Sequence, residues 1–133
     1  MKTIDPDRQT FRQIVAGIPA GRPIVMLNLL KFRTTAAYEN GAAMTGEAAY
    51  EHYLQLAVPC VEQLGGSTLW QGSAHGCIVA PPDEDWDRVI LVRYPSIEAF
   101  LALLKMPEYR ACSHHRNAAL EDARLICTIE ESR

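Results

Sequence analysis

The residues best suited to chemistry lie close together on one predicted helix. The segment that begins at Pro107 carries Tyr109, Cys112, His115 and Arg116. At about 100° per residue, Tyr109, Cys112 and Arg116 share the core-facing sector of this helix, and His115 falls at its edge. A guanidinium in that sector needs a partner, because an unpaired buried charge costs several kcal/mol. The spacing therefore predicts that Arg116 is an anchor, together with His115 as the second candidate catalytic residue.

Two kinds of partner are open for Arg116. A planar guanidinium pairs bidentately with a carboxylate, so a small organic anion is one candidate. A buried salt bridge to Asp87 or Asp122 is the other, and the sequence favours neither.

His115 is the candidate general acid or base. An imidazole with an ordinary pKa near ~6.5 needs only a modest shift to work at neutral pH. A histidine that only packs against its neighbours is the alternative. Cys112 and His115 could supply two metal ligands, but no third ligand has a suitable spacing, so no metal site is predicted.

Polar side chains within apolar segments complete the candidate ligand site. Asn28 interrupts an apolar strand, where its amide could orient a ligand or bond a neighbouring side chain or a buried water. Tyr50 and Tyr53 lie on the inward stripe of a long helix, where they line either the core or a pocket. With Asp87 and Tyr109, these residues form the predicted ligand-binding set.

Apolar periodicity places these residues on a series of helices and strands. A helix capped by Thr45 and ended by Gly65 and Gly66 contains Pro59, which should kink it without breaking it. The other predicted elements are helices over 7–17, 97–105 and 107–121, and strands over 23–32, 67–80, 86–94 and 122–129.

The element order predicts the fold class. After the first helix the order is βαββαβ, which with antiparallel pairing and helices on one face is the ferredoxin-like α+β arrangement. We expect residues 1–22 to form an N-terminal leader helix and residues 23–130 the ferredoxin-like domain.

The strands are apolar on both faces, which indicates a second partner for the sheet. Val25, Leu27 and Leu29 alternate with Met26 and Leu30 in the first strand. A sheet with one face in water should instead alternate apolar with polar residues. A homodimer packed sheet against sheet would cover the second face, and the leader helix of the same chain is the alternative cover.

Composition and charge exclude several classes of function. With 13 Lys and Arg against 16 Asp and Glu, the net charge is −3, and no basic stripe suits nucleic acid. The chain has no apolar run long enough for a membrane helix or signal peptide, so we expect a cytoplasmic protein without a membrane partner. Glycine-rich nucleotide motifs are missing, and no cofactor is predicted. The four cysteines have no CxxC pair and are expected to be buried and reduced.

A set of short motifs resembles a known family. The motifs are LNLLKF at 27–32, AYEHY at 49–53, the pair Gly65–Gly66, WDRV at 86–89, RYPS at 93–96, and PEY with HR within 107–116. They are similar to the domain of unknown function 1330 family, in the dimeric α+β barrel superfamily, over about residues 23–128. The positions that match the family are Asn28, Lys31, Tyr50, Tyr53, Trp86, Asp87, Tyr109, His115 and Arg116.

The resemblance implies a ferredoxin-like fold and a homodimer, without an established activity. Similar barrels serve as cofactor-independent monooxygenases, lactone isomerases, haem enzymes and stress proteins, so fold alone is a weak guide to function. The leader helix departs from the shorter members and could partly close a pocket.

These observations predict a homodimer that binds a small organic anion between sheet and helices. Arg116 would anchor the anion, with His115 and Asn28 as polar contacts. A cofactor-independent isomerase or monooxygenase-like enzyme is one form of this prediction, with proton transfer by His115. The alternative is a non-catalytic binding or stress-response module in which the Arg and His residues are structural.

Overall fold

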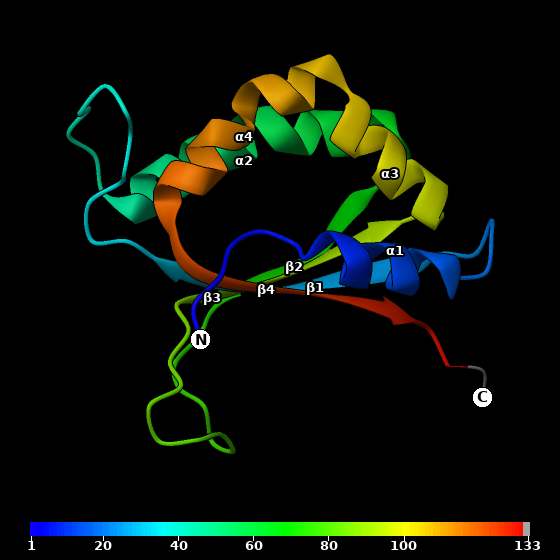
Figure 1. Ribbon diagram of the computed structural model, residues 1–133, viewed down its shortest axis with the longest axis horizontal. Helices are drawn as coiled ribbons and strands as arrows, with labels where there is room; N and C mark the ends of the chain where they lie inside the picture. The colour runs from blue at the N-terminus through cyan, green and yellow to red at the C-terminus, as the bar shows by residue number, and fades with distance from the viewer. Residues whose placement is uncertain (132–133) are drawn as a thin grey trace.

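One antiparallel sheet carries a layer of helices on one face (Figure 1). The computed structural model describes residues 1–131. Within them the strand order is β2-β3-β1-β4, so the first strand lies between the third and the last. The elements are α1 (Arg8–Ala16), β1 (Ile24–Phe32), α2 (Gly46–Gln63), β2 (Ser67–Ser73), β3 (Arg88–Tyr94), α3 (Ile97–Lys105), α4 (Pro107–Ala119) and β4 (Leu120–Ile129). The predicted ferredoxin-like α+β fold is confirmed.

Local sequence signals fix the ends of α2. The Thr45 side chain accepts a hydrogen bond from the backbone N–H of Ala48, as expected of an N-cap. Pro59 lies within the helix, which continues past it, as predicted. Gly65 has a φ of 82°, a left-handed conformation that glycine adopts without steric cost, and the chain there turns toward β2.

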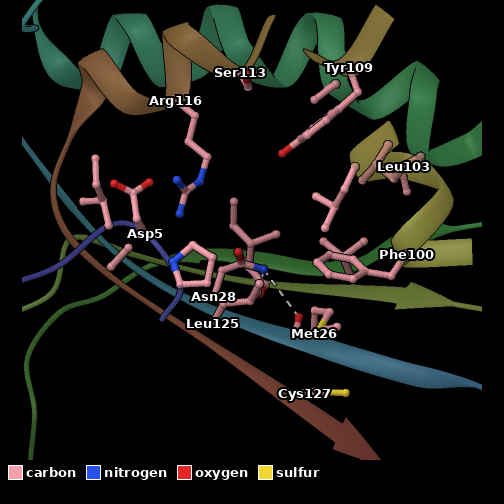
Figure 2. A pocket seen from close by; sticks show the side chains of 18 of the residues that line it. Asp5, Met26, Asn28, Phe100, Leu103, Tyr109, Ser113, Arg116, Leu125 and Cys127 are labelled. Carbon is pink, nitrogen blue, oxygen red and sulfur yellow. Dashed lines mark hydrogen bonds between the residues drawn. The ribbon is translucent and has the colours of Figure 1, made fainter. Parts of the chain in front are cut away.

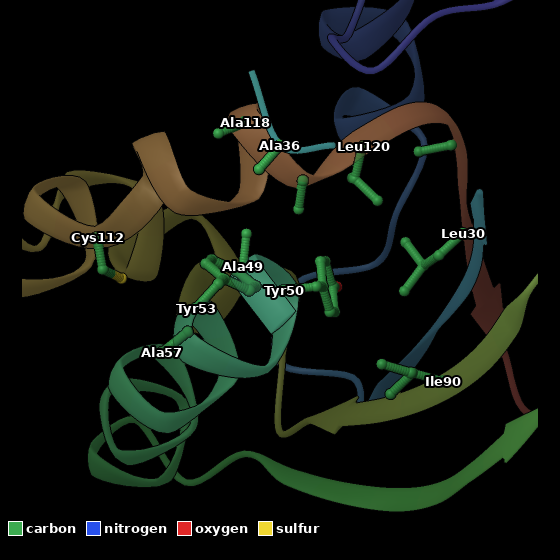
Figure 3. Close-up of a cluster of buried hydrophobic side chains, with 12 residues drawn as sticks. Leu30, Ala36, Ala49, Tyr50, Tyr53, Ala57, Ile90, Cys112, Ala118 and Leu120 are labelled. Atoms are coloured by element: carbon green, nitrogen blue, oxygen red, sulfur yellow. The ribbon is translucent and has the colours of Figure 1, made fainter. Parts of the chain in front are cut away.

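The core is divided into two clusters between the helices and the sheet. One cluster joins α2 and α4 to the sheet through Tyr50, Ala119 and Leu120 (Figure 3). The other gathers around Met26, Phe100 and other residues of β1, β3 and α3. The space between these clusters is where the candidate site lies.

The leader helix α1 packs on the helical side of the sheet (Figure 1). Phe11 stacks against Phe100 of α3 with ring centroids 6.5 Å apart, and Val15 and Ile18 join the same cluster. The alternative that the leader covers the second face of the sheet is therefore wrong. The amphipathic helix instead packs part of its apolar side beside α3, which leaves the outer face without a cover from α1.

Strand β2 is shorter than predicted. It ends at Ser73 and not at residue 80, and β3 begins at Arg88 and not at Trp86. Beyond the paired residues of β2 and β3, the N–H of Ala74 donates a hydrogen bond to the carbonyl of Asp87. The segment 75–86 has no facing strand to pair with, so it leaves the sheet as a loop.

Two further observations concern membrane helices and cysteines. Within residues 1–131, none of the helices combines the length and the apolar character that crossing a membrane requires.

Cys60 and Cys112 are buried as predicted, and Cys127 is half-buried. Cys77 is exposed, contrary to the prediction, because it lies in the loop after β2.

Candidate functional site

A cavity of about 640 Å³ lies between the helical layer and the sheet (Figure 2). Its floor comes from β1, β3 and β4, its roof from α2, α3 and α4, and one wall from the N-terminal segment. The volume falls within the roughly 300 to 1,000 Å³ that is usual for small-molecule sites. The predicted site residues that it brings together are Asn28, Tyr50, Tyr53, Tyr109 and Arg116.

Arg116 points from α4 into the cavity (Figure 2). Its side chain is half-buried, and its polar contact within residues 1–131 is with the Oδ1 of Asn117, at 3.5 Å. No carboxylate of the described chain lies within 4.0 Å of its guanidinium. The helical phase predicted its direction correctly.

The predicted salt-bridge partners of Arg116 are engaged elsewhere. Asp122 pairs with Arg124 at 2.6 Å and accepts the backbone N–H of Thr3 at 3.0 Å. Asp87 accepts the backbone N–H of Phe32 at 2.7 Å. The structure therefore rejects the salt-bridge alternative, since both carboxylates serve the ends of strands.

Two tyrosine hydroxyls form a polar pair in the cavity roof. The hydroxyls of Tyr53 on α2 and Tyr109 on α4 are hydrogen-bonded at 2.8 Å. Tyr50 lies against Tyr53 with ring centroids 5.2 Å apart. Burial raises the pKa of Tyr50 and of Tyr53, and the charge of Arg116 opposes this only in part. The hydroxyls of Tyr50 and Tyr53 therefore stay protonated at neutral pH.

Asn28 supplies a polar group on the floor of the cavity (Figure 2). Its Nδ2 donates to the carbonyl of Ile90 at 3.3 Å and reaches that of Met26 at 3.5 Å. The partners are thus backbone carbonyls of the sheet and not the neighbouring side chain that the sequence suggested. Both contacts use the amide nitrogen, which leaves the amide oxygen as an acceptor for a ligand.

His115 lies outside the cavity, on the other side of α4. Its Nδ1 is hydrogen-bonded to the hydroxyl of Tyr38 at 2.7 Å. The rings of His52 and His114 lie with their centroids 4.4 Å and 4.0 Å from that of His115. Burial first, and then the charges of His114 and His52, lower the pKa of His115. The structure does not bring His115 together with Arg116.

Asp87 is also absent from the cavity lining. It precedes β3, where its carboxylate binds the backbone of Phe32 and lies 4.0 Å from the Nζ of Lys31. The predicted ligand-binding role is replaced by one at the junction of β1 and β3.

The N-terminal segment adds lining residues that the motifs did not identify. Phe11, Ile14 and Val15 present the apolar side of α1 to the cavity, so the leader partly closes it, as the resemblance implied. Asp5 lies beside Arg116 in Figure 2, although the two do not form an ion pair within 4.0 Å. The amphipathic spacing of α1 was the available signal for the apolar residues, whereas Asp5 lies in an irregular segment without one.

Cys112 does not offer a reactive thiol. It is 2% exposed, and its Sγ contacts the carbonyl of Tyr109 at 3.2 Å. Burial raises the pKa of the thiol. A nucleophilic cysteine needs the opposite shift, so Cys112 acts as a core residue.

Comparison with known proteins identifies relatives at two levels of similarity. The model of the DUF1330 family, a domain of unknown function, matches residues 35–129. RPA0582, a protein of unknown function from Rhodopseudomonas palustris, is 40% identical, with 100% of both chains covered and a TM-score of 0.91. No curated protein matches the chain.

More distant structures share the fold alone. A dimeric protein of unknown function with a ferredoxin-like fold, from Bacteroides fragilis, has a TM-score of 0.51 and 12% identity, over 81% of this chain and 96% of that chain. The hydroxynitrile lyase from Passiflora edulis has a TM-score of 0.59 and 9% identity, over 85% of this chain and 97% of that chain.

Proposed function

The chain belongs to the DUF1330 family, and we propose that it binds a small organic anion with an apolar body in the cavity between sheet and helices. The observation that carries the proposal is the half-buried guanidinium of Arg116, which points into the cavity without a carboxylate partner among residues 1–131. A carboxylate ligand would satisfy its N–H groups through two parallel hydrogen bonds.

The remaining lining indicates what the body of the ligand is like. Phe100 and Leu103 line the part of the cavity away from Arg116 (Figure 2), so an aromatic or branched apolar group fits there. The Tyr53–Tyr109 hydroxyl pair and the amide of Asn28 are neutral polar groups that a hydroxyl or carbonyl on the ligand could meet. This combination favours a monocarboxylate over a highly charged metabolite.

Binding is better supported than catalysis by His115. The imidazole is held by Tyr38 on the far side of α4, so it cannot exchange a proton directly with a ligand in the cavity. Tyr50 and Tyr53 stay protonated because burial raises the pKa of each hydroxyl. An isomerase or monooxygenase-like reaction would need a proton acceptor other than His115.

We also propose that the outer face of the sheet joins two copies of the chain. Val25, Leu27 and Leu91 point away from the cavity, and Leu69 and Trp70 are 52% and 54% exposed on the same sheet. A contiguous apolar surface of this kind is typical of an interface. The description of the Bacteroides fragilis protein as dimeric, for a chain of the same fold, supports this proposal.

The ligand proposal is tested with matched acids and amides. Thermal shift and calorimetry would compare benzoate and phenylacetate with benzamide and phenylacetamide, which keep the ring but lack the charge. We expect the carboxylates to stabilise the protein and the amides to have little effect. Equal binding of acids and amides would contradict an anchoring guanidinium.

Two variants separate the charges at the site. Asp5→Asn should tighten carboxylate binding, because it removes a negative charge beside Arg116. Glu62→Gln is the matched control, since it also removes one negative charge, from an exposed residue of α2 that does not line the cavity. No change in Asp5→Asn would place the anion away from Arg116.

A further inference from the structure

We propose that the loop between β2 and β3, residues 74–87, clasps a second copy of the chain by inserting Ile78 and Val79 into a groove on the outer face of the partner's sheet. This inference rests on the proposed homodimer and names the contact that would hold it. Ile78 is 99% exposed and Val79 94% exposed. Because the two aliphatic side chains are adjacent, they form a small exposed apolar patch at the loop tip, the kind of surface that a protein contact covers.

The loop points in the direction that this contact requires. In Figure 1 it projects from the sheet on the side opposite the helices. Its tip therefore lies on the side of the uncovered sheet face and far from the cavity.

The base of the loop is held in place while its tip is free. Trp86 is 6% exposed, and its ring lies 5.2 Å from the guanidinium carbon of Arg124. The N–H of Ala74 donates to the carbonyl of Asp87, and a turn at Pro81 is closed by the N–H of Glu84. A loop ordered in this way loses less conformational entropy when its tip docks.

The outer face offers a groove that suits two aliphatic side chains. It has a volume of about 460 Å³ and is lined by Pro23, Val25, Leu27, Leu69, Leu91, Arg93, Thr128 and Glu130. These residues belong to the first half of β1 and β2 and the second half of β3 and β4, so they lie at one end of the sheet. The loop of residues 74–87 leaves the sheet at the other end, after Ser73 and before Arg88.

A loop and a groove at opposite ends of one face are self-complementary. A two-fold axis that lies between two facing sheets and runs across their strands places the loop end of each copy against the groove end of the other. Both loops then dock at once. No such match arises if the axis runs along the strands, because the two loops would meet at the same end.

Charge agrees with this arrangement. The stretch after the loop tip carries Asp83 and Glu84, both exposed. The groove lining contains one basic residue, Arg93, and one acidic residue, Glu130. No carboxylate of the described chain forms an ion pair with Arg93 within 4.0 Å. The acidic stretch of one copy can therefore approach Arg93 of the other as its loop docks.

The first test measures the mass of the protein over a dilution series. We expect the native chain to be a dimer, and the double variant Ile78→Asp, Val79→Asp to raise its dissociation constant by about 100-fold or more, because two buried aliphatic side chains become charged. Leu56→Asp is the control, since Leu56 is 44% exposed on α2, away from the sheet.

A second test looks for the contact directly. In Leu69→Cys, the exposed Cys77 of one copy should form a disulfide with the new cysteine of the other when copper–phenanthroline is the oxidant. Within one chain, Leu69 lies near the start of β2 and Cys77 lies in the loop beyond its end, so the product should be a covalent dimer on a non-reducing gel. Leu56→Cys should give none.

The outcomes separate the two proposals. A native chain that is monomeric at high concentration would overturn both the homodimer and the clasp. A dimer that survives the double variant unchanged and gives no Cys77 cross-link with Leu69→Cys would overturn the clasp and leave the sheet-to-sheet dimer standing.

Discussion

The two sides of helix α4 hold adjacent residues in opposite settings. Arg116 faces the cavity, where its guanidinium meets no carboxylate of residues 1–131, whereas His115 faces a cluster in which Tyr38 binds its Nδ1. The guanidinium of Arg116 is thus a charge without an acidic partner, whereas the imidazole of His115 already has a hydrogen-bond partner. A ligand can therefore gain binding energy from Arg116, while His115 contributes to the attachment of the loop that contains Tyr38.

The largest expected effect on stability is at Gly46, where the start of α2 meets the end of α4. A Cβ at Gly46 would lie 2.7 Å from the carbonyl oxygen of Ala119 and closer still to that of Arg33, and backbone atoms cannot move aside cheaply. We expect Gly46→Ala to lower the free energy of unfolding by about 2 to 3 kcal/mol, measured by chemical denaturation.

Gly76→Ala is the control for this prediction, because a Cβ there meets no atom within 4 Å. Equal stability of the two variants would mean that α2 and α4 are not packed as closely as the structure has them.

A smaller effect is expected on the histidine side. Tyr38→Phe keeps the ring but removes the hydroxyl that bonds Nδ1 of His115 at 2.7 Å. The expected loss is about 1 kcal/mol of unfolding free energy, the usual net value of one such bond. Phenylacetate binding should be unaffected. Weaker binding in this variant would contradict the separation between the cavity side of α4 and the side that holds His115.

His115 should make the free energy of unfolding depend on pH. The folded pKa of His115 lies below its ordinary value of 6.5, because of burial and the nearby His114 and His52. The neutral imidazole is thus favoured by folding, and its contribution to stability is present above the ordinary pKa and lost as pH falls through the folded value.

Denaturation from about pH 7 to about pH 5 measures this dependence. His115→Gln should flatten the decline in stability, whereas His75→Gln, in the exposed loop after β2, should leave it unchanged. A decline that is identical in the native chain and in His115→Gln would assign it to other groups.

The smallest effect on stability is expected for Arg116→Gln. With no carboxylate to leave unpaired, the change should cost about 0.5 kcal/mol or less. A loss above about 2 kcal/mol would indicate a buried ion pair and would contradict the cavity-facing guanidinium.

The fold and one side of α4 could be predicted from local sequence signals. Apolar runs, the Thr45 cap and the glycine pair predict the order of strands and helices, and the helical phase predicts that Arg116 faces inward. These features depend on residues near each other in the chain, so the sequence is enough to predict them.

The positions that failed depend on distant partners. His115 is hydrogen-bonded to Tyr38, which lies in a loop without periodicity, and Asp87 is held by the backbone of Phe32. Strand β2 stops early because its neighbour β3 begins only at Arg88. The spacing of residues along the chain does not predict any of these contacts, because the partners are far apart in the sequence.

The most direct test is a calorimetric titration of phenylacetate into the native chain, Arg116→Gln and His115→Gln. We expect Arg116→Gln to weaken binding by about 10-fold or more, because the hydrogen bonds from a charged group are lost. His115→Gln should stay within about twofold of the native affinity. Weak binding in His115→Gln together with native affinity in Arg116→Gln would contradict the central claim that the cavity side of α4 is the anion site.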